Sequence, residues 1–405
     1  MPVIAVILLP VACKAVLNLS KQPFLLQVRL FCVPKQLFLL IEKTWASKNI
    51  GKDRALAVLL SRKETGMEKR KKVPYSTVVL ILFIALLLSI ILSFALGRYP
   101  VPPKELMGIL LSKLFNIEPF WEETMELVLF NIRLPRILLA CLVGCCLSAA
   151  GAAYQGVLQN PMAAPDILGA SSGAAFGAAL AILFNQASWT IIISAFVFSL
   201  ITIALVIFIG ERSRGKKVLG LILSGIMISS LFSAATSFIK LVADPANQLP
   251  AITYWLMGSL KAAKPGELLF AIFPMAAGLI PLLLLRWRIN VLTLGDEEAR
   301  TMGVNTEVLR NIVIVCATLI TAASVSVSGM IGWVGLVIPH FARRMVGNNY
   351  NHLMPASMML GAIFLLLVDD VSRNLLATEI PIGILTAFIG APFFIYLITR
   401  EGERY

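Results

Sequence analysis

Charged residues are scarce in this 405-residue sequence: only 14% of its residues are Asp, Glu, Lys or Arg, whereas 58% are hydrophobic. A soluble chain needs about 25% charged residues to keep its surface solvated. The mean hydropathy of +0.86 is far above what such a surface allows. The composition therefore excludes an ordinary soluble protein and predicts a chain that lies mostly within a membrane.

Histidine is nearly absent, and cysteine lacks the spacing that metal sites need. The only histidines are His340 and His352, and the six cysteines include no Cys-x-x-Cys pair. Zinc sites and disulfide frameworks depend on such spacings, so we predict no metal site and treat the cysteines as apolar packing residues. A membrane-embedded enzyme, which would need clustered His, Asp or Glu at membrane depth, is disfavoured for the same reason.

The net charge of +13 comes from short basic clusters between long apolar runs, such as Lys69–Lys72 and Arg212–Lys217. A nucleic-acid-binding domain gathers its basic residues on one soluble face. Basic clusters between apolar runs are instead typical of cytoplasmic loops next to a membrane. We therefore expect membrane lipid, and no nucleic acid, among the partners.

The long uncharged runs predict ten membrane-spanning helices in an all-α, polytopic bundle, since about 20 mainly apolar residues cross the hydrocarbon core. Two runs are too long for one helix: Asn185 and Gln186 divide the first, and Ser326, Ser328 and Gly329 divide the second. The predicted spans lie in Val73–Gly97, Leu134–Gln155, Ile167–Gly210 (two spans), Val218–Ile239, Leu268–Leu285, Asn311–Ala342 (two spans), Leu353–Val368 and Ile380–Thr399.

The distribution of Lys and Arg predicts the orientation of these spans. Lys69–Lys72 place the start of the first span in the cytoplasm, because cytoplasmic loops carry an excess of basic residues. Alternation then puts Glu211–Lys217, Arg286–Arg310 and Arg343–Asn351, all of which carry basic residues, on the same side. We therefore expect the N- and C-termini of the ten-helix domain, residues 67–405, to be cytoplasmic.

Residues 1–66 do not fit this pattern and form an atypical N-terminal extension. Their apolar runs, such as Val3–Val11, are too short to span a membrane, and no basic segment precedes them as it would in a secretory signal. Met67 is followed directly by the basic cluster that precedes the first span. We expect either that translation begins at Met67 or that the extension is a poorly ordered appendage.

Glycines recur at spacings that allow close packing of helices. A Gly-x-x-x-Gly repeat lets two helix backbones approach closely in a membrane, and glycine also permits an irregular turn. The expected packing residues are Gly169, Gly173 and Gly177 in the third span and Gly329, Gly332 and Gly335 at the start of the eighth.

The sequence carries no ATP-binding element of its own. Gly210–Lys217 matches the Gly-x4-Gly-Lys spacing of a phosphate loop, but Lys217 replaces the hydroxyl residue that would bind magnesium, and a predicted membrane helix precedes it instead of a strand. We interpret the segment as a basic loop. The chain is therefore not expected to be an enzyme, and any ATP would be used by a separate subunit.

Several blocks in a fixed order carry a resemblance to a known family. They are Arg133–Arg136 (RLPR), Gln159–Pro165 (QNPMAAP) with Ile167–Gly169 and Ser171–Ala174, Tyr254–Ser259 (YWLMGS), Leu294–Val304 (LGDEEARTMGV), Gly329–His340 (GMIGWVGLVIPH) with Arg343, and Asp369–Arg373, Glu379–Gly383 and Gly390–Phe394. Over residues 73–400 the chain resembles the FecCD-type permeases of bacterial ATP-binding-cassette (ABC) importers, which carry iron complexes and vitamin B12. Family members usually have Leu at Met162 and Ala at Asp369.

The resemblance implies a permease subunit in the bacterial cytoplasmic membrane that binds no cofactor. It implies a homodimer or a heterodimer with a sister permease, two ATPase subunits that use ATP, and one extracytoplasmic substrate-binding protein. An iron-siderophore is the expected cargo, with haem and cobalamin as alternatives. An ion-coupled secondary transporter is the alternative of another class, but the central parts of the predicted spans lack the ionisable residues typical of it.

The resemblance also assigns roles to charged residues at the predicted outer ends of the spans. Arg133, Arg136 and Arg373 would dock acidic residues of the binding protein, since arginine binds carboxylates in a bidentate fashion; the alternative is anchoring of helix ends to lipid phosphates. Three nearby carboxylates are candidates for function or for simple pairing with Arg373: Asp369, Asp370 and Glu379.

Two segments on the predicted cytoplasmic side complete the candidate site. Pro161 and Pro165 prevent a helix across the loop that follows the second span, and the resemblance implies that Asn160 and Met162 belong to a cytoplasmic gate. A plain connection between helices is the alternative.

A short amphipathic helix is predicted between the sixth and seventh spans. It could lie on the membrane surface, but the resemblance implies that it is the coupling helix, which fits a groove on the ATPase. Its residues are Leu294, Gly295, Asp296, Glu297, Glu298, Ala299, Arg300, Met302 and Gly303.

Overall fold

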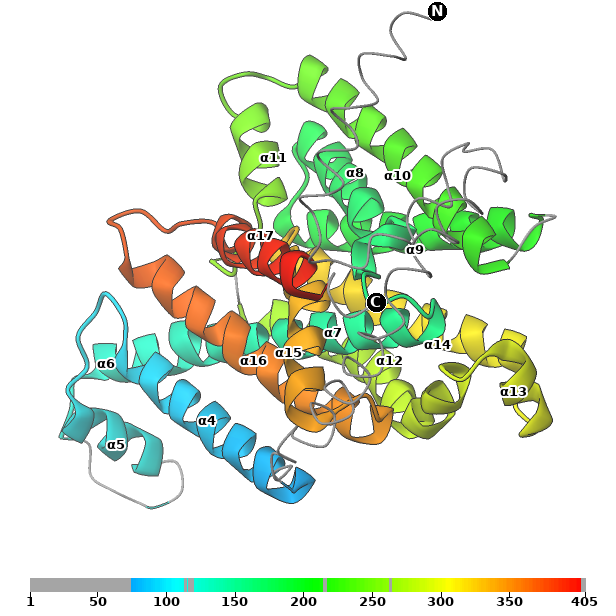
Figure 1. Cartoon of the computed structure of the whole chain (residues 1–405). Coiled ribbons are helices and arrows are strands. Elements are labelled where there is room, and N and C mark those ends of the chain that lie inside the picture. The colour runs from blue at the N-terminus through cyan, green and yellow to red at the C-terminus, as the bar shows by residue number, and fades with distance from the viewer. Residues whose placement is uncertain (1–73, 113–114, 116–119, 214–216, 262–263, 402–405) are drawn as a thin grey trace, which may run out of the picture. The chain divides into compact units, whose positions relative to one another are not determined.

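Figure 1 shows a computed structural model of the chain, which describes residues 74–401 apart from short gaps at 113–114, 116–119, 214–216 and 262–263. The expected extension at residues 1–66 lies outside the described residues. All regular structure in the described part is helical. The α-helices are α4 (Tyr75–Ala95), α5 (Pro103–Ser112), α6 (Glu123–Leu127), α7 (Leu134–Val157), α8 (Ala170–Leu183), α9 (Ser188–Glu211), α10 (Lys217–Val242), α11 (Gln248–Leu256), α12 (Pro265–Leu292), α13 (Asp296–Thr301), α14 (Thr306–Ser328), α15 (Val334–Val346), α16 (Tyr350–Asn374) and α17 (Ile382–Glu401).

Seven of these helical segments are long and apolar enough to cross a membrane by length and composition alone. They are α4, α6 continued through a π-helical turn into α7, α9, α10, α12, α14 and α16. The shorter helices α8, α15 and α17 occupy the three remaining predicted spans. The predicted all-α, polytopic membrane bundle is therefore confirmed, while the cytoplasmic location of both termini stays a prediction.

The breaks between helices fall where the sequence predicts them. Asn185 lies between α8 and α9 in a left-handed conformation, with a φ of 51°. α14 ends at Ser328, and Gly329 follows with a φ of 67°, a value that favours glycine. Two long uncharged runs thus become two helices each, although Ser326 and Ser328, which are also expected at the second break, still belong to α14.

The two ends of the bundle are named by the residues found there. α7 begins next to Arg136, at what we call the Arg136 end. Just beyond the last turn of α7, the Gln159 side chain donates a hydrogen bond of 2.8 Å to the carbonyl of Leu292, the last residue of α12. α13 follows α12 directly (Figure 1), so this second end is the α13 end.

α7 is the central helix of the bundle. It packs against α12, α14, α15 and α16, and every residue from Val143 to Val157 except Cys145 is buried. By contrast, α4 and α10 leave most of their apolar side chains exposed, for example Leu88 and Met227. Such exposure suits helices that face lipid, because lipid tails are as apolar as the side chains themselves.

Small residues let α7 approach its neighbours closely. A side chain on Gly151 would overlap the backbone carbonyl of Gly335 at the start of α15, and one on Gly144 would overlap the carbonyl of Gly361 in α16. Gly173 and Gly177 of α8 lie equally close to α9. Gly332 differs from the expectation for this group, since no atom outside its own neighbourhood lies within 4 Å of the position that its Cβ would take.

Three chain segments that interrupt helices meet beyond the end of α14. Ser259 N–H donates a 2.7 Å hydrogen bond to the carbonyl of Ser328, and Gly383 N–H donates to the carbonyl of Met257 at 3.1 Å. A side chain on Gly329 would overlap the carbonyl of Trp255. These bonds satisfy backbone groups that helices cannot, as membrane-embedded backbone requires.

Replacement of Gly151 by Val tests the close approach of α7 and α15. The new side chain cannot avoid the Gly335 backbone, so the free energy of unfolding should fall by about 1–3 kcal/mol, the usual range for overpacking. Denaturant unfolding in detergent, followed by tryptophan fluorescence, measures it. Gly332→Ala is the matched control and should change stability by no more than about 0.5 kcal/mol; equal losses in both variants would contradict the packing described.

Candidate functional site

The three arginines expected to dock a partner lie together at the Arg136 end, but they are buried. Arg133 is 3% exposed, Arg136 is 6% exposed and Arg373 is 7% exposed. Arg133 ends the π-helical turn, Arg136 lies in the first turn of α7, and Arg373 lies in the last turn of α16. A buried guanidinium must find acceptors within the protein, and each of the three does.

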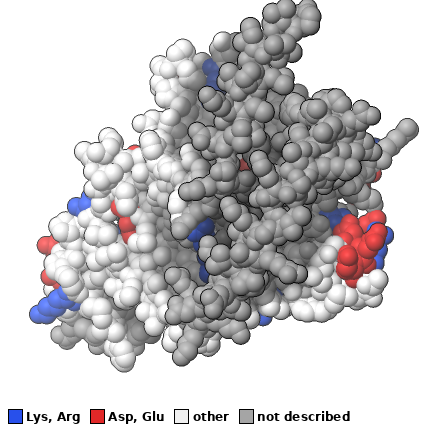
Figure 2. Space-filling view, in the orientation of Figure 1, with Lys and Arg blue, Asp and Glu red and all other residues white. Residues whose placement is uncertain are grey.

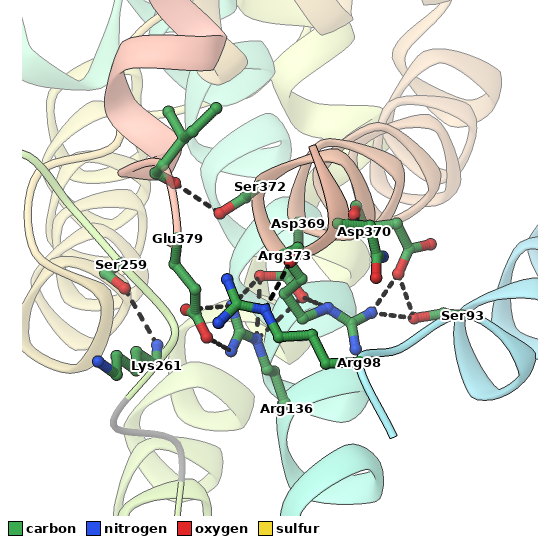
Figure 3. Close-up of polar contacts among 12 residues, drawn as sticks. Ser93, Arg98, Arg136, Ser259, Lys261, Asp369, Asp370, Ser372, Arg373 and Glu379 are labelled. Carbon is green, nitrogen blue, oxygen red and sulfur yellow. Dashed lines mark hydrogen bonds and ion pairs between the residues drawn. The ribbon is translucent and has the colours of Figure 1, made fainter. Parts of the chain in front are cut away.

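Asp369 of α16 lies between two of these arginines (Figure 3). Arg136 donates to its carboxylate through Nη2 at 2.9 Å and through Nε at 3.1 Å. Arg373 Nε approaches the other carboxylate oxygen, Oδ2, at 3.1 Å. Asp369 itself is fully buried, so a single carboxylate balances parts of two buried positive charges.

Arg136 also holds a second carboxylate, that of Glu379 in the segment between α16 and α17. Its Nη1 donates to Oε1 at 3.2 Å and its Nη2 to Oε2 at 3.1 Å. This is the bidentate fork that makes arginine a strong carboxylate ligand. Glu379 lies three residues before Ile382, the first residue of α17, so Arg136 ties the start of α17 to α7.

Asp370 connects these arginines and carboxylates to α4. Ser93 Oγ donates to Asp370 Oδ1 at 2.7 Å. Arg373 Nη2 donates to Ser93 Oγ at 2.8 Å and also to Asp370 Oδ1. We call Ser93, Arg136, Asp369, Asp370, Arg373 and Glu379 the ionic cluster; it joins α4, α7, α16 and the segment that leads into α17.

Arg133 stands beside the ionic cluster and does not belong to it. Its two terminal nitrogens donate to the backbone carbonyls of Phe94, in the last turn of α4, and of Tyr99, in the segment that follows α4. The guanidinium thereby satisfies the Phe94 carbonyl, one of those that the end of α4 leaves without helical partners, and the Tyr99 carbonyl beyond it. Its contacts hold the end of α4 against the start of α7.

Two roles are expected for these residues: docking of a partner protein by the arginines, and internal pairing of the carboxylates with Arg373. The simple alternative, pairing of Asp369 and Asp370 with Arg373, is what the ion pairs show. Glu379 pairs with Arg136 instead of Arg373. Docking of a partner's carboxylates by Arg133, Arg136 and Arg373 stays a prediction, and it would have to compete with these internal acceptors.

Two exposed cations flank the ionic cluster, and the sequence patterns did not single them out. Arg98 donates through Nε to the carbonyl of Arg373 at 3.1 Å and through Nη2 to that of Leu376 at 3.3 Å. Lys261 follows α11, and Arg98 and Lys261 both lie near Glu379 in Figure 3. The one sequence feature that could have pointed to Arg98 and Lys261 is that each is a basic residue in a segment between predicted helices.

The charges around Glu379 determine its protonation. Partial burial alone would raise the pKa of this carboxyl, but hydrogen bonds and charge from Arg136, together with the charges of Lys261 and Arg98, hold the pKa below its ordinary value of 4.5. Glu379 is therefore ionised at neutral pH, as its ion pair with Arg136 requires.

The two predicted gate residues lie in the connection between α7 and α8. Asn160 Oδ1 accepts a 2.9 Å hydrogen bond from the Met162 N–H, and the Met162 side chain is exposed. Gln159 before them bonds to the end of α12, which places the loop at the α13 end. A short 3-10 turn, Pro165–Leu168, then leads into α8. The role of this loop as a gate stays a prediction.

The predicted amphipathic helix is present as α13, although it has only six residues. Figure 2 shows its acidic and basic side chains gathered at the edge of the molecule where Figure 1 places α13. Leu294 and Met302, which flank the helix, are 61% and 52% exposed. Ala299 differs from the other predicted coupling residues, because it is fully buried against the chain's own core.

The glycines at the two ends of this segment have conformations that other residues rarely adopt. Gly295 precedes the first turn of α13 with a φ of 128°, and Gly303 follows the last turn with a φ of 78°. They let a short helix turn sharply out of α12 and into α14. In the described part of the chain, no three His, Cys, Asp or Glu side chains come together as a metal site would require.

This architecture, a bundle of apolar helices with a short charged helix exposed at one end, is that of a polytopic membrane permease. Residues 85–400 match the model of the FecCD transport family, and the chain belongs to that family. It is a permease subunit of an ABC importer and a multi-pass protein of the bacterial cytoplasmic membrane.

Individual relatives differ in their cargo. The chain is 40% identical over 331 residues to the molybdate import permease MolB of Haemophilus influenzae, covering 81% of this chain and 98% of MolB. It is 43% identical over 277 residues to a Helicobacter pylori (strain J99) protein named a probable iron chelatin transport permease, covering 68% and 84%. A solved metal-chelate type ABC transporter in an inward-facing conformation has 39% sequence identity, a TM-score of 0.73, and coverage of 80% and 99%.

Replacement of Asp369 by Ala should lower the free energy of unfolding by about 3–5 kcal/mol, because it leaves two buried guanidiniums without their shared carboxylate. Asp369→Asn keeps the volume and isolates the effect of the charge. The matched control is Glu307→Ala: its carboxylate is half exposed in a 3.7 Å ion pair with Arg300, and its loss should cost about 0–1 kcal/mol. Equal losses at the two sites in denaturant unfolding would refute the buried cluster.

The lowered pKa of Glu379 predicts a pH dependence of stability. A carboxyl whose pKa is lower in the folded than in the unfolded state contributes stability above the unfolded value. That contribution should be lost as the pH falls from 4.5 through the lower folded pKa. Thermal unfolding of Glu379→Gln should therefore lack part of the acid destabilisation that the parent shows. Parallel curves for parent and variant would contradict the Arg136–Glu379 pair.

Proposed function

We propose that this permease imports a metal chelate, with an iron-siderophore as the first candidate, and that a separate ATPase subunit drives it. The single observation that carries the coupling part is the α13 segment, in which a charged helix and the exposed apolar residues Leu294 and Met302 that flank it lie at one end of the bundle. Helices of this kind dock into grooves of partner proteins. The α13 end then lies in the cytoplasm, as the positive-inside pattern predicts.

The proposed assembly contains two permease subunits, identical or sister chains, with two ATPase subunits at the α13 end and one substrate-binding protein at the Arg136 end. ATP binding and hydrolysis would rock the permeases between inward and outward access. Asn160 and Met162 would then narrow the path on the cytoplasmic side. Membership of an ABC family supports this arrangement over ion-coupled secondary transport, which we do not retain.

The proposed cargo is supported by the groove that α17 forms with neighbouring segments. A groove of about 650 Å³ lies between α11, the start of α15 and α17, and none of the described residues that line it, which include Trp333 and Phe388, is charged. We propose that this groove faces the path between the two permeases. An apolar lining suits the organic shell of a chelate better than a strongly hydrated ion. Haem and cobalamin complexes fit the same reasoning.

Molybdate is the second candidate, because the MolB relative matches over 98% of its length. Transport by the complete importer in proteoliposomes separates the two cargoes, with a ferric siderophore and molybdate offered in turn together with the binding protein. ATP-dependent uptake of the ferric siderophore alone is expected. Uptake of molybdate alone would replace the chelate proposal by import of an oxyanion.

The ATPase contact is testable at the exposed residues of the α13 segment. Leu294→Asp or Met302→Asp should weaken association with the ATPase at least tenfold, or about 1.4 kcal/mol, because each puts a charge into an apolar contact. Binding is measured by microscale thermophoresis with the permease in nanodiscs. Leu376→Asp is the matched control, since Leu376 is equally exposed but lies between α16 and α17 at the other end. Unchanged affinity in both α13 variants would refute this contact.

A further inference from the structure

α13 is held to α14 by two ion pairs of different character. Arg310 Nη2 donates to Asp296 Oδ1 at 2.6 Å, with the arginine side chain only 5% exposed. Arg300 and Glu307 approach to 3.7 Å, but both side chains are at least half exposed. Exposed pairs contribute little and are screened by salt, whereas a pair with a buried member resists screening. The Asp296–Arg310 pair is therefore the stronger connection.

The contact with Asp296 uses only part of the Arg310 guanidinium. Asp296 accepts from Nη2 at 2.6 Å, whereas the buried Nε has no hydrogen-bond partner among the described residues. α13 in turn has only six residues, too few to hold a position by its own hydrogen bonds. The pair thus fixes the first turn of α13 to the second turn of α14.

The surroundings of Arg310 leave room for movement at this end of α14. A cavity of about 360 Å³ borders Arg310, and its lining includes Glu211 at the end of α9 together with Glu307 and Asn311 of α14. Asn311 Nδ2 donates to Glu211 Oε1 at 3.1 Å and so connects α14 to the end of α9. A closely packed interior would oppose displacement of a buried side chain; the cavity next to Arg310 permits it.

α14 runs without interruption from this pair to the interrupted segments near the Arg136 end. It is a single α-helix from Thr306 to Ser328. The carbonyl of Ser328 accepts the 2.7 Å hydrogen bond from Ser259 N–H. A helix is stiff along its axis. If a pull on Arg310 shifts α14 along that axis, Ser328 and the loop bonded to it through Ser259 should therefore shift as well.

We infer that Arg310 is a positioning residue that transmits movement of α13 to α14, and through α14 to the loop at Ser259. The inference rests on the proposed function, because an ATPase must move α13. The exposed Arg300–Glu307 pair then contributes little to this transmission. The movement of α13 passes to α14 through the buried Arg310 side chain of the Asp296–Arg310 pair.

The test uses the full chain in nanodiscs with the ATPase that co-purifies with it. All native cysteines are replaced, and Ser259→Cys supplies one labelling site in the loop after α11. The rate of maleimide labelling at this cysteine is measured with and without ATP plus vanadate. In the parent, nucleotide should change the rate at least about threefold, a difference of about 0.65 kcal/mol. In Arg310→Gln this nucleotide effect should disappear, while the ATPase still binds and hydrolyses ATP.

Charge exchange separates transmission from a purely structural role. The double variant Asp296→Arg with Arg310→Asp restores an ion pair with reversed signs and should recover the nucleotide-dependent change in labelling. Arg300→Gln is the matched control and should behave like the parent. If Arg310→Gln does not fold, Asp296→Asn replaces it, because Asp296 is half exposed and its side chain keeps its shape.

The outcomes separate this inference from the proposed function. Loss of the labelling change with retained ATPase binding, and its recovery in the exchanged pair, supports the inference. A labelling change as large in Arg310→Gln as in the parent overturns it and leaves the proposed function standing. If no ATPase co-purifies with the parent, the proposed function and the inference fail together.

Discussion

A charged side chain buried among apolar helices must be paired, and the pairing of Arg136 with Asp369 meets this demand where several helices converge. Arg136 reaches Asp369 at 2.9 Å and Glu379 at 3.1 Å, and Arg373 shares Asp369. Loss of one partner would strand a buried charge at a cost of several kcal/mol. The positions of α7, α16 and the start of α17 are therefore set by the same few atoms.

The opposite end of the bundle obeys a different constraint. α13 is short, bounded by glycines and largely exposed, and its buried contacts with the bundle are those of Ala299 and of Asp296 with Arg310. The proposed function would use both features, because an importer subunit coupled to an ATPase would hold one end still while the element at its other end moved. α14 spans the distance between these ends as one uninterrupted helix.

Much of the fold follows from local sequence, and much of the site does not. Apolar runs and the breaks at Asn185 and Gly329 predict the helices, because the bilayer fixes helix length. Partners far apart in sequence leave no local pattern: Arg136 and Asp369 are 233 positions apart, and Ser93 and Asp370 are 277 apart. Ala299 and Gly332 show the same limit, since burial and close contact depend on neighbours that only the folded chain supplies.

Photocrosslinking from position 302 tests the central claim, that the α13 end contacts the ATPase, most directly. With benzoylphenylalanine at Met302 and the complete importer in its native membrane, the account predicts a covalent adduct with the ATPase subunit. The same label at Leu376 should give none. An adduct with lipid alone from position 302, in an importer that still hydrolyses ATP and transports its cargo, would contradict the account.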